Sequence, residues 1–205
     1  MADMPLFPLK TVLLPGNRLS LKIFESRYVD MIAACMRDLS PFGVVMIYKG
    51  EETQTDTDIY SVGTTATICD WEHRADGLLG ITIIGGERFD ILSTHTEADG
   101  LTRAQIKILV DSTGEEIPEQ FFYLQELLDN IIAQAGLAQE PSAGFSQTLY
   151  RLIYLLPLDA NLKQRLLEIQ ESNDRAVILH AELIRLGIIQ YVKPGSDDPQ
   201  WGSNS

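Results

Sequence analysis

Residues 4–28, MPLFPLKTVLLPGNRLSLKIFESRY, constrain the fold of this chain more than any other stretch. Pro5 and Pro8 have no backbone N–H to donate, so they predict short, broken strands here rather than a central strand. The Pro15-Gly16 pair that follows predicts a turn. The stretch is therefore expected to thread through a β-rich body by way of its edges.

The second half of this stretch changes its hydrophobic period. Residues 18–23 alternate polar and apolar side chains, which is typical of a half-buried strand. From Phe24 onward the apolar residues recur at helical spacing, and this predicts an amphipathic helix over about residues 25–39, ended by Pro41. The helix is expected to be attached to the β-rich body.

A run of strands follows the predicted helix. Two Asp-Gly pairs, at residues 76–77 and 99–100, predict hairpin turns, and Gly85-Gly86 predicts a further turn. With the earlier segments they give about six or seven antiparallel strands, which favours a small barrel or pseudo-barrel. The expected strands are residues 42–48, 59–71, 78–84, 88–96 and 101–110.

The last part of the chain has helical periodicity. Four helices are expected, over about residues 118–136, 145–156, 162–169 and 173–187. Pro118 is expected in the first turn of the first helix, Asp159 is expected to cap the third, and Asn173 or Asp174 is expected to start the fourth. Strands followed by helices predict an α+β protein. We expect a β-rich subdomain at 1–113, a helical subdomain at 114–192 and a flexible tail at 193–205.

Charge and cysteine content limit the function. The chain has 16 basic and 29 acidic residues, a net charge of −13, and no basic cluster, so we expect no binding to nucleic acid or to anionic membranes. Cys35 and Cys69 have no metal-binding spacing and are expected to be buried, reduced thiols, with a disulfide as the alternative. The N-terminus lacks the pattern of a signal peptide, and no apolar run approaches the span of about 18 residues that a membrane helix needs. A cytoplasmic protein is expected.

Ordered motifs along nearly the whole chain resemble the N-terminal, substrate-binding domain of Lon proteases. The helical part contributes KQxLLE at residues 163–168, followed by Arg175. The β-rich part contributes PLFPL (5–9), VLLPG (12–16), LxIFExRY (21–28), FGVV (42–45), VGTxAxI (62–68), DGLL (76–79) and GxxRF (85–89).

This resemblance implies a PUA-like β pseudo-barrel followed by a helical bundle, and a role in holding polypeptide substrates. The chain contains no GxxxxGK[ST] nucleotide loop, and its 205 residues leave no room for ATPase and Ser-Lys protease domains. We therefore expect a stand-alone protein of this type, without enzymatic activity and without a cofactor.

Apolar residues, among them prolines and methionines, are the candidates for a polypeptide-binding surface. Exposed prolines protect a sheet edge, and methionine surfaces adapt to varied partners. The alternative for each residue is that it belongs to the core. The candidates are Phe7, Pro8, Leu13, Pro15, Tyr28, Met31 and Met46.

Three polar residues are expected to be structural. Glu25 lies at a helix start, Arg27 is expected to pair with it or to cap the barrel, and Arg88 is expected to close the barrel as a hydrogen-bond donor. A ligand-facing role is the alternative. No catalytic constellation is recognisable, and the scattered histidines His73, His95 and His180 do not predict a metal site.

Three functions are compatible with the sequence. The first is a non-catalytic module that engages exposed hydrophobic segments of unfolded or partly folded polypeptides, in a groove between barrel and helices, together with a protease or chaperone. The second is a nucleic-acid-binding PUA-like protein, which fold analogy permits but the charge opposes. The third is an uncharacterised enzyme. A monomer or weak dimer is expected.

Overall fold

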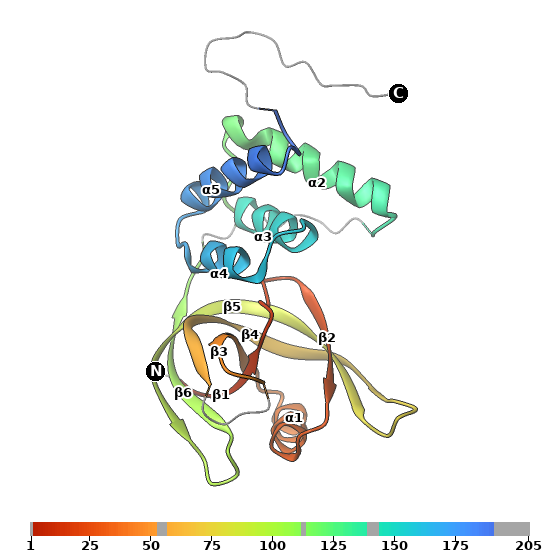
Figure 1. The fold of residues 1–205 in the computed structure, drawn as a ribbon, viewed down its shortest axis with the longest axis vertical. Helices are drawn as coiled ribbons and strands as arrows, with labels where there is room; N and C mark the ends of the chain where they lie inside the picture. The colour runs from red at the N-terminus through yellow and green to blue at the C-terminus, as the bar shows by residue number, and fades with distance from the viewer. Residues whose placement is uncertain (1, 53–56, 112–113, 139–143, 191–205) are drawn as a thin grey trace.

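A barrel and a separate group of helices make up the computed structural model, which describes residues 2–52, 57–111, 114–138 and 144–190 (Figure 1). The predicted α+β class, with helices after strands, is confirmed. The strands are β1 (Ala2–Leu9), β2 (Arg18–Ile23), β3 (Phe42–Lys49), β4 (Asp58–His73), β5 (Leu79–Thr96) and β6 (Thr102–Leu109). The helices are α1 (Ser26–Asp38), α2 (Phe122–Ala135), α3 (Phe145–Leu155), α4 (Ala160–Glu168) and α5 (Ser172–Arg185), with a short 3₁₀ turn at Glu119–Phe121.

Five strands close into the barrel and the sixth lies outside it. The strand order is β2-β5-β4-β3-β1-β6, and a further pairing of β5 with β6 closes the ring. Throughout the described part of the chain, β2 pairs with β5 alone. One edge of β2 is therefore free of a neighbouring strand.

The first strand differs from its prediction in two respects. β1 is one continuous strand, and it pairs antiparallel with β6 through Ala2–Pro5 but parallel with β3 through Leu6–Leu9. The predictions of broken strands and of an all-antiparallel barrel were therefore wrong. Each half of β1 has a partner on one side only, so half of its backbone N–H groups need no ladder acceptor and prolines are tolerated.

The glycine pair at residues 85–86 does not turn the chain, contrary to the prediction. β5 runs through both residues without a break. A Cβ atom on Gly85 would collide with the Leu14 carbonyl group, and one on Gly86 would lie 2.5 Å from Thr65 Oγ1. These glycines therefore permit close approach of neighbouring chain segments rather than a reversal.

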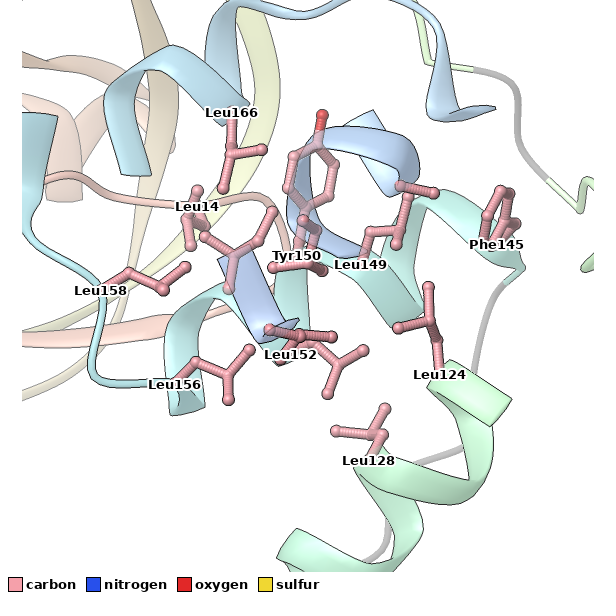
Figure 2. Close-up of a cluster of buried hydrophobic side chains, with 14 of the residues drawn as sticks. Leu14, Leu124, Leu128, Phe145, Leu149, Tyr150, Leu152, Leu156, Leu158 and Leu166 are labelled. Atoms are coloured by element: carbon pink, nitrogen blue, oxygen red, sulfur yellow. The ribbon is translucent and has the colours of Figure 1, made fainter. Parts of the chain in front are cut away.

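Two main cores lie on either side of the segment that joins β1 to β2. Leu14 packs among the leucines and aromatic rings of α2–α5, as Figure 2 shows. Leu13, next to it, belongs to the core between the barrel and α1, and α1 lies on the side of the barrel away from α2–α5 (Figure 1). The joining segment thus connects both cores.

The two cysteines have different environments. Both are free, with Cys35 buried in α1 and Cys69 exposed in β4. The prediction of a buried thiol was wrong for Cys69, because it lies in the part of β4 that extends into the projecting β4–β5 hairpin, where most side chains are exposed. The Asp76-Gly77 turn of this hairpin and the Asp159 cap of α4 are confirmed. The predicted tail at 193–205 lies outside the described residues.

Candidate functional site

The boundary between barrel and helices, where a groove was predicted, is packed with buried side chains. Arg88 of β5 is fully buried there. Its Nε and Nη2 donate to Asp111 at 3.2 and 2.5 Å, and its Nη1 donates to the carbonyl oxygens of Leu167 and Ile169 at 2.8 and 3.1 Å. Arg88 therefore joins the barrel to the helices.

A second buried arginine completes this network. Arg175 of α5 donates to Ser146 and to main-chain oxygens, and its guanidinium lies 4.4 Å from the centre of the Tyr150 ring. The Tyr150 hydroxyl donates to Asp111 Oδ2 at 2.9 Å. Burial raises the pKa of Tyr150 and lowers that of Arg175. The Asp111 carboxylate is thus the counter-charge of two buried guanidinium groups. This packed network forms a junction between the barrel and the helices rather than a binding cleft.

The structure buries all seven candidate residues of the polypeptide-binding surface. Three of them, Phe7, Pro8 and Tyr28, also line a groove beside β2, and Met31 lines a second groove on the other side of α1. Leu13, Pro15 and Met46 are buried in the body of the protein. Phe7, Tyr28 and Met31 share the core beside α1 with Leu13. Leu13, Pro15 and Met46 line neither groove.

The first groove, which we call the edge groove, has a volume of about 250 Å³ and lies beside β2. Its apolar lining comes from β1, β2 and the start of α1. Phe24 is 58% exposed at this groove, although sequence periodicity placed it with the buried face of the helix. The lining residues are Phe7, Pro8, Leu9, Ser20, Leu21, Lys22, Ile23, Phe24, Glu25, Tyr28 and Glu52.

A charged pair holds the helix start against the barrel. Arg27, only 7% exposed, has its Nη2 2.8 Å from Glu25 Oε2, and its Nη1 donates to the carbonyl oxygen of Gly100 at 2.9 Å. The same guanidinium lies 4.6 Å from the centre of the Tyr28 ring, which in turn meets the Phe7 ring edge-on. This contact chain fixes one wall of the edge groove.

Alkaline pH is expected to destabilise the fold through the buried tyrosines. Burial raises the pKa of Tyr28 to about 12, whereas an unfolded tyrosine ionises near pH 10. Between these two pKa values only the unfolded state loses the tyrosine proton. The stabilisation that Tyr28 gives the folded state is therefore fully present below about pH 10, and above it the free energy of unfolding falls by about 1.4 kcal/mol per pH unit. Burial also raises the pKa values of Tyr123 and Tyr150, which add to the slope. Urea unfolding at several alkaline pH values should show the combined decrease, and Tyr28→Phe should make it less steep by about 1.4 kcal/mol per pH unit. An equal slope in the variant would contradict the assignment.

The second groove has a volume of about 620 Å³ and lies between α1 and the turn that joins β5 to β6. Its floor is apolar and its rim is mostly acidic. We call it the acidic groove. Its lining residues are Asp3, Met4, Pro5, Arg27, Asp30, Met31, Ala34, Cys35, Asp38, Ser40, Pro41, Glu97, Asp99, Leu101 and Arg103.

Sequence reasoning missed both the free edge of β2 and the acidic groove. The alternation of residues 18–23 shows a strand but carries no information on how many neighbours the strand has. The acids of the second groove come from three separate parts of the chain, so their proximity has no local signal.

Within the described residues, no group of three or more His, Cys, Asp or Glu side chains is placed to hold a metal ion. The helices in that part of the chain are also too short or too polar to cross a membrane.

Comparison with models of protein families shows which family the chain belongs to. The model described as the ATP-dependent protease La (LON) substrate-binding domain matches residues 3–185. The chain belongs to this family. The recognition of a Lon-type N-terminal domain from sequence motifs is therefore confirmed, and the matched domain is the substrate-binding part of the protease rather than its ATPase or peptidase part.

Solved structures of the LON substrate-binding family share the fold. A Lon N-terminal domain protein from Xanthomonas campestris superposes with a TM-score of 0.76 at 28% identity, covering 88% of this chain and 98% of that one. The N-terminal domain of Lon protease from Mycobacterium avium complex has a TM-score of 0.65 at 14% identity, over 88% and 97% of the two chains, and this likeness shows the fold alone.

Curated relatives are longer proteins. Lon protease of Amoebophilus asiaticus is 25% identical over 85% of this chain and 22% of its own length. Protein cereblon of Xenopus tropicalis is 30% identical over 52% of this chain and 24% of its own length. The chain thus spans about a quarter of the length of these relatives.

Proposed function

We propose that this protein is a non-catalytic polypeptide-binding module and that extended, apolar segments bind in the edge groove. Membership of the LON substrate-binding family supports the general role. The observation that carries the location is the free edge of β2 beside an apolar groove.

A free strand edge is suited to binding an extended chain. An edge strand presents backbone N–H and C=O groups that have no partner in the sheet, and an added strand pairs with them whatever its sequence. Apolar pockets beside the edge then select alternate side chains. Phe7, Leu9 and Tyr28 provide such apolar surface in the edge groove.

The rim of the groove suits apolar segments with few charges. Phe24 offers exposed aromatic surface, while Lys22 and Glu52 carry opposite charges on the lining. Lys22 is already paired with Asp76 at 2.8 Å. Selection is therefore expected to rest on apolar contact and backbone pairing rather than on charge.

Replacing the exposed aromatic ring should weaken this binding. We expect Phe24→Ser to reduce affinity for a reduced and alkylated, permanently unfolded protein by about tenfold, because the loss of one buried aromatic contact corresponds to roughly this factor. Fluorescence anisotropy of the labelled unfolded protein, titrated with the intact chain, measures the effect.

A matched control is available in the helical part. Phe122 of α2 is 54% exposed, close to the 58% of Phe24, and does not line the groove. Phe122→Ser should leave affinity unchanged. Equal losses in both variants, or binding unaffected by either, would contradict the proposed location, and absence of binding by the unaltered protein would contradict the function.

A further inference from the structure

We infer that the acidic groove is a second polypeptide contact site, and that it takes segments in which basic residues alternate with small apolar residues. This goes beyond the proposed function, because it concerns a different groove with a different chemistry.

The groove is large enough for several residues of a peptide. Its volume of about 620 Å³ lies within the range of about 300–1,000 Å³ that is common for binding sites. One wall is α1, which contributes Asp30, Ala34 and Asp38, and the opposite wall is the β5–β6 turn with the start of β1.

The floor is apolar and adaptable. Met4, Met31, Cys35 and Leu101 lie there, each 7% exposed or less. Burial raises the pKa of the Cys35 thiol, so it stays protonated and adds to the apolar surface. Thioether side chains adjust their rotamers to varied partners, which suits a floor that receives different small apolar residues.

The rim has an excess of negative charge. Five acidic residues line the groove against two arginines, and both arginines are already engaged. Arg27 pairs with Glu25, and Arg103 Nε lies 2.6 Å from Asp3 and 3.6 Å from Glu97. Bound polypeptide therefore meets net negative charge.

Two of the five acids make no ion pair in the described part of the chain. Asp30 is exposed on α1, and Asp99 is exposed in the turn, where its Oδ1 accepts only the backbone N–H of Leu101 at 2.9 Å. Asp38 is paired with Arg37, and this pairing lowers the pKa of its carboxyl. Asp30 and Asp99 stand on opposite walls and are free to receive lysine or arginine side chains.

The spread of these acids favours a polycation over a metal ion. No three acidic, histidine or cysteine side chains among the described residues converge on one point, as an oxygen-coordinated cation requires. Separated charges above an apolar floor instead match a chain that carries its positive charges several ångströms apart.

A labelled peptide of about eight residues that alternates lysine and valine tests this inference, with a glutamate-valine peptide of equal length as the reference. Titration with the intact protein should show binding of the lysine peptide alone, weaker at high salt. The double variant Asp30→Asn and Asp99→Asn should lose affinity about threefold to tenfold. Asparagine keeps the size of the side chain and can still accept the Leu101 hydrogen bond.

Two controls separate this inference from the proposed function. Glu116→Gln with Glu126→Gln makes the same change of net charge at exposed positions outside the groove and should leave the lysine peptide bound as before. Phe24→Ser should also bind this peptide normally. Equal losses in both double variants, or no binding of the lysine peptide while unfolded protein still binds at the edge groove, would overturn the inference and leave the proposed function standing.

Discussion

Asp111→Ala is expected to lower the free energy of unfolding by about 3–5 kcal/mol, the usual cost of removing one partner from a buried ion pair. Arg88 and Arg175 are both fully buried, and Asp111 is the carboxylate between them, with Oδ1 2.5 Å from Arg88 Nη2 and 3.6 Å from Arg175 Nη2. Its removal leaves two buried guanidinium groups without a counter-charge. The shift in the urea midpoint measures the loss.

Two further variants calibrate this result. Tyr150→Phe removes one hydrogen bond to Asp111 and keeps the ring beneath Arg175, so it should cost only about 1 kcal/mol. Asp38→Asn removes an exposed pair with Arg37 and should leave the midpoint unchanged. An Asp111→Ala variant no less stable than Tyr150→Phe would show that the network does not hold the barrel and the helices together.

The second large effect is expected at Gly85. A methyl group there meets the Leu14 carbonyl group, with the carbonyl carbon only 3.0 Å away, and the collision is with backbone rather than with a flexible side chain. The same site makes two backbone hydrogen bonds, from Gly16 N to Gly85 O at 2.8 Å and from Gly85 N to Asn17 O at 2.9 Å. Gly85→Ala should therefore displace the joining segment and cost about 1–3 kcal/mol.

Gly80→Ala, in the same strand, is the matched control. Its new methyl group would meet the side chains of Glu72 and Arg74, which can move aside. This variant should therefore be within about 0.5 kcal/mol of the parent protein. If both variants unfold at the same urea concentration, close packing at Gly85 does not stabilise the fold.

Local sequence signals predicted the secondary structure well where the physical cause is local. The Asp-Gly turns, the period of α1 and the Asp159 cap depend on a few neighbouring residues, and the structure contains them. The Gly85-Gly86 pair shows the limit. Glycine permits both a turn and a close approach, and only the tertiary structure reveals that Leu14 and Thr65 lie against it.

The candidate site was less accessible to sequence reasoning. Phe7, Tyr28 and Met31 were selected by residue type, but residue type does not separate a groove wall from a core position, and the structure buries all of them. Arg88 was expected to act within the barrel, whereas its partners Asp111 and Leu167 come from later parts of the chain. Long-range pairing of this kind leaves no pattern in a single sequence.

Amide hydrogen exchange of the intact protein, with and without a saturating apolar peptide, tests the central proposal most directly. A peptide that adds to the sheet takes up the free backbone donors of β2, and exchange of those amides slows. We expect protection concentrated in residues 18–24, with α2–α5 unchanged. Peptide binding that protects the helices and leaves β2 exchanging at its original rate would contradict it.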